Sequence, residues 1–72
     1  MKITYFQDTD PLYLEFNNNP IVETQEINEN TLVYLDKDGN ICAITLEQAR
    51  NLTDLNAFSI ETIVAPQLAS SL

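Results

Sequence analysis

Two apolar runs on either side of a turn-forming cluster constrain the fold of this chain more than any other feature. The segment Thr31–Leu46 reads TLVYL, then DKDGN, then ICAITL, a pattern that predicts a β-hairpin. Asp36 suits the first turn position because its carboxylate can accept hydrogen bonds from backbone amides two residues on. Gly39 suits a left-handed position because it has no Cβ. Both runs are apolar on both faces, which predicts central strands covered by another part of the fold or by a second subunit.

The same cluster resembles the start of a calcium-binding loop. Asp36 and Asp38 stand at alternate positions, and Glu47 occupies the twelfth. A calcium loop of this kind needs a helix on each side and a glycine at the sixth position, but Ile41 stands there, and a β-branched residue is unsuited to positive φ. Glu47 would lie more than ~20 Å along a strand from the cluster. We therefore predict that Asp36, Asp38 and Gly39 form a structural turn and bind no metal.

Three further strands are expected before the hairpin. Each is a short run of β-branched, aromatic or alternating residues bounded by clusters of Asp, Asn and Pro. The runs are Lys2–Phe6, Leu12–Phe16 and Ile21–Ile27. The third is the most polar of them, which suits a sheet edge where charges discourage pairing between molecules.

One short helix is expected after the hairpin. Thr45 and Gln48 have the spacing of a capping box, which predicts a helical turn or two over Glu47–Leu52. The sequence pattern of residues 59–65 predicts either a sixth strand or a helix capped by Ser59. The expected fold is α+β: a single domain over residues 1–65, with a small antiparallel meander of about five strands and one short helix. Residues 66–72 are expected to form a loose C-terminal tail.

Charge narrows the classes of partner. Eleven carboxylates face three cations, and the net charge is −8. Nucleic-acid binders need a basic surface, and anionic membranes repel an acidic chain, so neither nucleic acid nor a membrane is an expected partner. The charge has two remaining interpretations. It keeps a small domain in solution, or it complements the surface of a basic protein.

Enzymatic chemistry has few candidate groups. The chain has no His, one Cys and one Gly, which excludes His-dependent nucleophiles, zinc sites of the usual type and glycine-rich phosphate loops. No cofactor is therefore expected. Cys42 is predicted to be a buried structural thiol, and a lone cysteine without a secretory signal indicates a cytoplasmic protein. The remaining acid–base candidates are two carboxylate pairs, Asp8 with Asp10 and Glu23 with Glu26.

Candidate partner-binding residues come from the second predicted strand and the acidic segment after it. Tyr13 and Glu15 share one face of their strand, and an exposed tyrosine beside acidic groups is a plausible contact. The alternative is that Tyr13 packs under the helix or across a dimer interface. With Glu23 and Glu26, these two residues form the predicted partner-binding set.

Four short motifs in order resemble a small bacterial family of domains of unknown function. The chain carries MKITY at 1–5, DPLYL at 10–14, ETQEI at 23–27 and DKDGNICAIT at 36–45. The family pattern is Met-Lys-Ile-x-Tyr, Asp-x-Leu-Tyr-Ile, Glu-Thr-x-Glu-Val and Asp-x-Asp-Gly-x-Val-Val-Gly-Ile-Glu. Ala43 and Thr45 replace its Gly and Glu, so no carboxylate acts at position 45. The resemblance implies a small antiparallel β domain with a helix and no assigned activity. It also implies that some relatives are antitoxin partners of small ribonuclease-like toxins.

Together these observations predict a non-enzymatic acidic protein-interaction module, in its sharpest form an antitoxin-like partner of a basic protein. The alternative is a small homo-oligomeric structural or housekeeping protein, and a carboxylate-based hydrolase ranks third. A homodimer is expected in either of the first two cases, because one short helix cannot cover both faces of the central hairpin.

Overall fold

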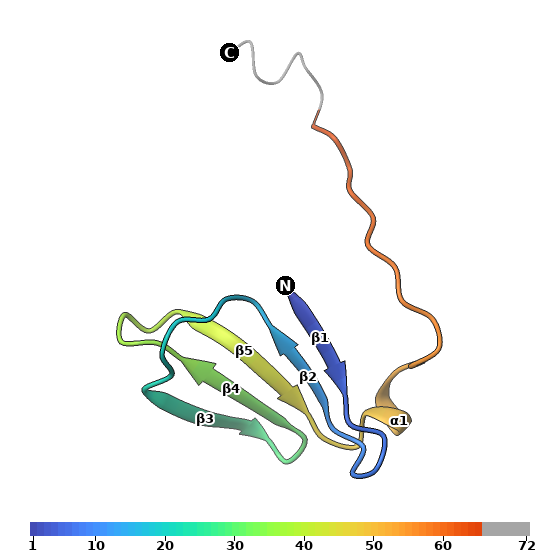
Figure 1. The fold of residues 1–72 in the computed structure, drawn as a ribbon, viewed down its shortest axis with the longest axis horizontal. Coiled ribbons are helices and arrows are strands. Elements are labelled where there is room, and N and C mark those ends of the chain that lie inside the picture. Colours follow the sequence, from blue (N-terminus) through green and yellow to red (C-terminus); the bar gives the residue numbers. More distant parts are fainter. Residues whose placement is uncertain (66–72) are drawn as a thin grey trace.

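The computed structural model describes residues 1–65, and the predicted loose tail at 66–72 lies outside the described residues. Within residues 1–65 the chain forms a five-stranded antiparallel sheet and one short helix (Figure 1). The elements are β1 (Lys2–Tyr5), β2 (Leu12–Glu15), β3 (Glu23–Asn28), β4 (Thr31–Leu35), β5 (Ile41–Leu46) and α1 (Ala49–Leu52). The expected antiparallel sheet with one short helix is therefore present, although the fold is mostly β.

The strand order is β1-β2-β5-β4-β3, and the prediction of a simple meander was wrong. A meander would place β3 beside β2, but β2 pairs with β5, and Tyr13 lies opposite Thr45. Burial explains the order. β5 has buried residues on both sides and occupies the centre, whereas all six residues of β3 are exposed and form an edge. A central strand is covered by neighbours on both sides, and a polar strand tolerates an edge.

The strand register divides the sheet into two unlike faces. Residues paired across an antiparallel ladder point to the same face, so one row runs across all five strands through Ile3, Leu14, Ile44, Val33 and Gln25. A second row on this side contains Tyr5, Leu12 and Leu46. We call the side that carries these two rows the apolar face, and the opposite side, which carries Thr4, Tyr13 and Thr45, the polar face.

The turn between β4 and β5 is built on one aspartate. The Asp36 carboxylate accepts hydrogen bonds from the backbone amides of Asp38 and Asn40, each at 2.9 Å. Hydrogen bonding from the Asn40 backbone first, and from Asp38 next, lowers the pKa of the Asp36 carboxyl. Gly39 has a φ of +82°, a conformation that L-residues rarely adopt.

The predicted capping box is wrong. Thr45 lies inside β5 and its hydroxyl is 2.8 Å from the Tyr34 hydroxyl on the polar face. The helix begins after Gln48, which has a left-handed φ of 55° and makes no side-chain cap hydrogen bond. The strand continues to Leu46, and its extended backbone keeps Thr45 from serving as a cap.

The expected sixth strand or helix over residues 59–65 is not formed. Residues 57–65 belong to no strand or helix, and Figure 1 shows this segment leading away from the sheet. No helix within the described residues is long and apolar enough to cross a membrane.

Very little apolar surface is buried. The buried hydrophobic side chains are Val33, Cys42, Ala43 and Ala49, of which three are small. Figure 1 shows a sheet of a single layer, with α1 at one end of it. A sheet normally buries its apolar face against a second layer. The apolar face of this sheet therefore has no complete cover among residues 1–65.

Candidate functional site

A polar cluster joins the β1–β2 turn to the start of α1. Asp10 lies just before Pro11 with a φ of 77°, a left-handed conformation that aspartate tolerates better than most residues. Its carboxylate accepts a hydrogen bond from the Tyr5 hydroxyl at 2.6 Å and one from the Arg50 backbone amide at 3.1 Å. The Arg50 guanidinium donates to the Tyr5 hydroxyl at 3.2 Å and lies 3.9 Å from the Asp10 carboxylate.

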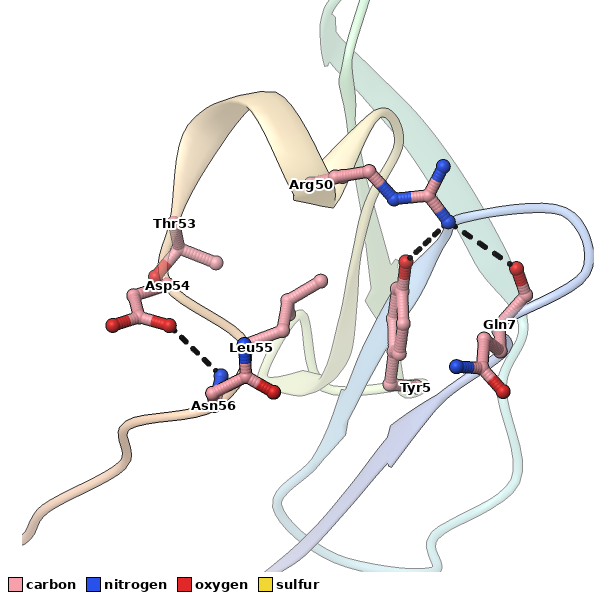
Figure 2. A pocket seen from close by; sticks show the side chains of 7 residues that line it. All are labelled: Tyr5, Gln7, Arg50, Thr53, Asp54, Leu55 and Asn56. Carbon is pink, nitrogen blue, oxygen red and sulfur yellow. Dashed lines mark hydrogen bonds between the residues drawn. The ribbon is translucent and has the colours of Figure 1, made fainter.

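A shallow cavity of about 390 Å³ opens beside this cluster, and Figure 2 shows the side chains around it. Its lining residues are Tyr5, Gln7, Arg50, Thr53, Asp54, Leu55 and Asn56. Arg50 also donates to the Gln7 carbonyl at 3.4 Å, and the Asp54 carboxylate accepts a hydrogen bond from the Asn56 backbone amide. The two charged groups of the cavity wall, Arg50 and Asp54, are therefore hydrogen-bonded to other residues of the wall.

The cluster does not form the acid–base pair that the sequence suggested. Asp10 bonds to Tyr5 and Arg50, whereas no contact joins it to Asp8 within the described residues. The hydrogen bond to Asp10 raises the pKa of Tyr5, and the neighbouring Tyr5 raises the pKa of Arg50. Both groups therefore keep their protons more firmly, which suits a structural role better than proton transfer near neutral pH.

Cys42 is the only thiol, and it is 1% exposed. Burial raises the pKa of this thiol, with a further contribution from the charge of Asp36. Reactive cysteines need the opposite, an accessible setting that lowers the pKa. Cys42 therefore has the surroundings of a structural residue.

Three of the four predicted partner-binding residues lie on one face of the sheet. Pairing places Glu26, Leu32, Thr45 and Tyr13 in one row of the polar face, and Glu15 lies two positions along β2 from Tyr13. Tyr13 and Glu26 are three strand spacings apart, about 14 Å. Glu23 belongs to the other face, because it shares an alternate position with Gln25 on β3. The four residues therefore do not form one site, and Glu23 and Glu26 point to opposite sides of the sheet.

Tyr13 packs against Tyr34 on the polar face. Its ring meets the Tyr34 ring edge-on, with centroids 6.0 Å apart and an interplanar angle of 61°. Edge-to-face packing of this kind stabilises a pair of aromatic rings. The pKa of Tyr13 is raised mainly because burial removes solvent from its hydroxyl. The tyrosine pair, with the Tyr34–Thr45 hydrogen bond, covers the middle of the polar face.

The apolar face is the larger candidate surface. The sequence predicted an uncovered apolar face on the central hairpin, but it did not predict which other strands extend that face. Ile3 is 38% exposed at one edge of this face, and Leu14 and Ile44 are only half-buried near its centre. Alternation within Leu12–Phe16 placed Leu12 and Leu14 on a common side. Only the β2–β5 pairing, however, shows that Ile44 and Leu46 extend the same surface.

Carboxylates lie at the margins of this surface, and ion pairs neutralise little of their charge. Among residues 1–65 only one ion pair is formed, between Asp10 and Arg50. Glu23 and Gln25 mark the β3 border of the apolar face, and Asp54 lies near the opposite border, beside β1. The face is therefore an apolar patch with acidic groups at its margins.

The chain was compared with known proteins. Searches of curated proteins and of solved structures returned no match. One protein-family model matches residues 2–50, which span all five strands and the start of α1. The chain therefore belongs to the family described as "Protein of unknown function (DUF2283)".

Proposed function

We propose that this protein is a non-enzymatic interaction module that binds another protein through its apolar face. One observation carries the proposal. Within residues 1–65 Val33 is the only large aliphatic side chain that is buried, although the apolar face presents isoleucine, leucine and valine on four adjacent strands. Apolar patches of more than a few hundred Å² are rare on monomers and mark binding sites.

Charge supports a basic partner. The net charge is −8. Glu23 and Asp54, at the margins of the apolar face, form no ion pair within residues 1–65, so their charges can attract cations on a partner surface. Complementary charges steer two proteins together and suppress wrong partners, while the apolar centre of an interface excludes water. An antitoxin-like role, in which this chain covers a basic protein, fits this combination.

The polar cluster gives less support to an enzyme. The cavity beside Tyr5 and Arg50 is partly open to solvent, and its two charged groups are hydrogen-bonded, Arg50 to Tyr5 and Asp54 to the Asn56 amide. No His is available, and the single thiol is buried. A hydrolase needs converging carboxylates in a cleft, whereas Asp10 is bonded to Tyr5 and Arg50, and Glu23 and Glu26 face apart.

A homo-oligomeric structural protein is the second candidate. Its support is the same uncovered surface, because a second copy can cover an apolar face as well as a different protein can. The two functions differ in which protein protects the face. The test must therefore show whether the apolar face is the binding surface and which protein binds to it.

Two adjacent residues of β2 allow a matched test. Leu14→Gln alters the apolar face, and Tyr13→Gln alters the polar face one position away. Both variants and the parent are used to capture proteins from the native host, and binding of the captured basic protein is then titrated with purified components. Circular dichroism melting verifies that each variant is folded.

We expect Leu14→Gln to weaken binding at least tenfold and Tyr13→Gln to weaken it less than twofold. The reverse order would move the binding site to the polar face and overturn the proposal. Binding of only a second copy of this chain, with no basic protein, would favour the homo-oligomeric alternative.

A further inference from the structure

Residues 57–65 form an extended segment that lacks the usual partners of a strand. They make no backbone hydrogen bond with any other residue in 1–65. The large apolar side chains of this segment are strongly exposed: Phe58 68%, Ile60 68%, Ile63 83% and Val64 79%. Four such side chains on an unpaired backbone indicate a segment that pairs with another surface.

Residues 57–61 have the alternation of a half-buried strand. In an extended chain Phe58 and Ile60 point to one side, and the alternation ends at Glu61, because Thr62 follows on the apolar side and Ile63 on the other. Ser59 and Glu61 point to the other side, and Glu61 is the only charge between residues 57 and 65. A matching sheet edge must therefore offer apolar groups on one face and a polar or basic group on the other.

The outer edge of β1 meets these requirements. β1 and β3 are the two edge strands of the sheet. β1 directs Ile3 and Tyr5 to the apolar face and Lys2 and Thr4 to the polar face. Lys2 is one of only three cations in the chain, so this edge can neutralise a single carboxylate.

The outer edge of β3 meets these requirements for an apolar and a polar or basic face poorly. All six residues of β3 are exposed, and they include Glu23 and Glu26 on opposite faces. Either face of β3 would therefore place a carboxylate near Glu61, and like charges across a strand pair destabilise it.

One antiparallel register matches every position. It sets Phe58 opposite Tyr5, Ser59 opposite Thr4, Ile60 opposite Ile3 and Glu61 opposite Lys2. The apolar pairs then continue the apolar face, and the polar and charged pairs continue the polar face. A shift by one residue would exchange the two faces and lose both matches.

The exit path of the chain leads away from its own β1 edge. Thr53, Asp54, Leu55, Ala57 and Phe58 line a cavity of about 270 Å³. Its other wall is formed by Ile3, Tyr5 and Leu12, which belong to the apolar face. The chain therefore passes over this face rather than beside the edge of β1, and Figure 1 shows residues 59–65 leading away from the sheet.

We propose that residues 57–61 of one copy add as a sixth strand to the outer edge of β1 in a second copy. Reciprocal exchange by the two copies closes a twofold-symmetric dimer. This inference goes beyond the proposed function, because it uses the edge of the sheet, whereas the basic partner is assigned to its face. The added strands also widen the apolar face of each subunit.

Disulfide trapping between two different single-cysteine chains tests the proposal. Cys42→Ala removes the native thiol from every chain. One chain then carries Thr4→Cys and the other Ser59→Cys, and the two are mixed and oxidised. The proposed register places these residues opposite each other, with Cα atoms about 4.5–5.5 Å apart, a separation that suits a disulfide. The control chain carries Thr24→Cys on the polar face of the other edge strand, β3.

We expect a Thr4→Cys/Ser59→Cys heterodimer at least ten times more abundant than the Thr24→Cys/Ser59→Cys product. Equal yields would overturn the proposal. A chain that carries both Thr4→Cys and Ser59→Cys distinguishes pairing between two copies from pairing within one chain. A disulfide within that chain, with none between mixed chains, would show that the segment folds back onto its own β1 and would also overturn it.

Sedimentation tests the same interface without cysteines. Ile60→Ser removes a side chain that faces Ile3 of the second copy, whereas Ile63→Ser removes an isoleucine beyond the end of β1. We expect Ile60→Ser to weaken dimerisation at least tenfold and Ile63→Ser to weaken it less than threefold. A parent chain that stays monomeric at high micromolar concentration would overturn the proposal and leave the assignment of the partner-binding face untouched.

Discussion

The backbone amide of Arg50 donates a hydrogen bond to the carboxylate of Asp10 across 3.1 Å, although 40 positions separate the two residues. The Asp10 carbonyl also accepts a hydrogen bond from the Ala49 amide at 3.1 Å. A helix of four residues is too short to be stable by itself. Asp10 therefore holds the first residues of α1 against the β1–β2 turn.

Replacement of Asp10 by alanine tests this anchor. We expect Asp10→Ala to lower the free energy of unfolding by about 1–3 kcal/mol, because it leaves the Tyr5 hydroxyl and the Arg50 amide without their acceptor. Asp8→Ala, an exposed change in the same turn, should stay within about 0.5 kcal/mol of the parent. Urea denaturation measures both, and hydrogen exchange should become faster at Ala49 and Arg50. Equal effects of the two substitutions would contradict the anchor.

The hairpin turn needs a glycine at position 39 because of the backbone conformation there, and not because a larger side chain would lack room. No atom lies within 4 Å of the position that a Cβ on Gly39 would take, yet φ is +82°. We expect Gly39→Val to destabilise the fold by roughly 1–3 kcal/mol through backbone strain, and Gly39→Asn to destabilise it less because asparagine tolerates positive φ. Cys42→Ala should cost about 1 kcal/mol, since it removes one small buried group. A larger loss for Cys42→Ala than for Gly39→Val in thermal melts would refute the turn assignment.

Asp36 should make stability depend on acid pH. The pKa of its carboxyl is lowered in the folded state, so its contribution is complete above the ordinary pKa of about 3.9. That contribution disappears as pH falls through the lowered folded-state value. Asp36→Asn removes the titration. The stability difference between parent and Asp36→Asn should therefore be largest near neutral pH and should shrink below about pH 4. A difference that stays constant across this range would argue against the carboxylate hydrogen bonds.

Salt should strengthen the dimer. Two copies that each carry −8 repel one another, and we expect this repulsion to outweigh the single attraction between Glu61 and Lys2 in the proposed dimer. Raising the ionic strength from about 0.01 M to about 0.15 M shortens the screening length from about 30 Å to about 8 Å. Sedimentation equilibrium should show tighter association at the higher salt concentration. Weaker association there would mean that attractive charge pairs dominate the interface.

Much of the fold follows from local sequence chemistry. The hairpin of β4 and β5 was predicted from two apolar runs and the DKDGN turn, and the structure contains it at Thr31–Leu35 and Ile41–Leu46. The ranges predicted for the first two strands agree with β1 and β2 to within a residue. These features depend on residues near one another in the chain, so local patterns carry them.

The candidate sites could be predicted only in part. The carboxylates Asp8 and Asp10 are close in sequence, but Asp10 bonds to Tyr5 and to Arg50, which lies far along the chain. The capping box failed for a related reason. Thr45 pairs with Tyr13 and Leu32 in neighbouring strands, and this extended pairing removes it from the helix.

The sequence by itself determined the strands, the glycine-dependent turn and the acidic charge, because each is set by side chains that act on nearby backbone or on solvent. Only the tertiary structure decided that β2 lies beside β5 and that Leu14 and Ile44 share one apolar face. It alone showed that Phe58 and Ile60 are each 68% exposed. Strand order and burial depend on contacts between distant segments, and alternation within one segment contains no information about which strand becomes its neighbour.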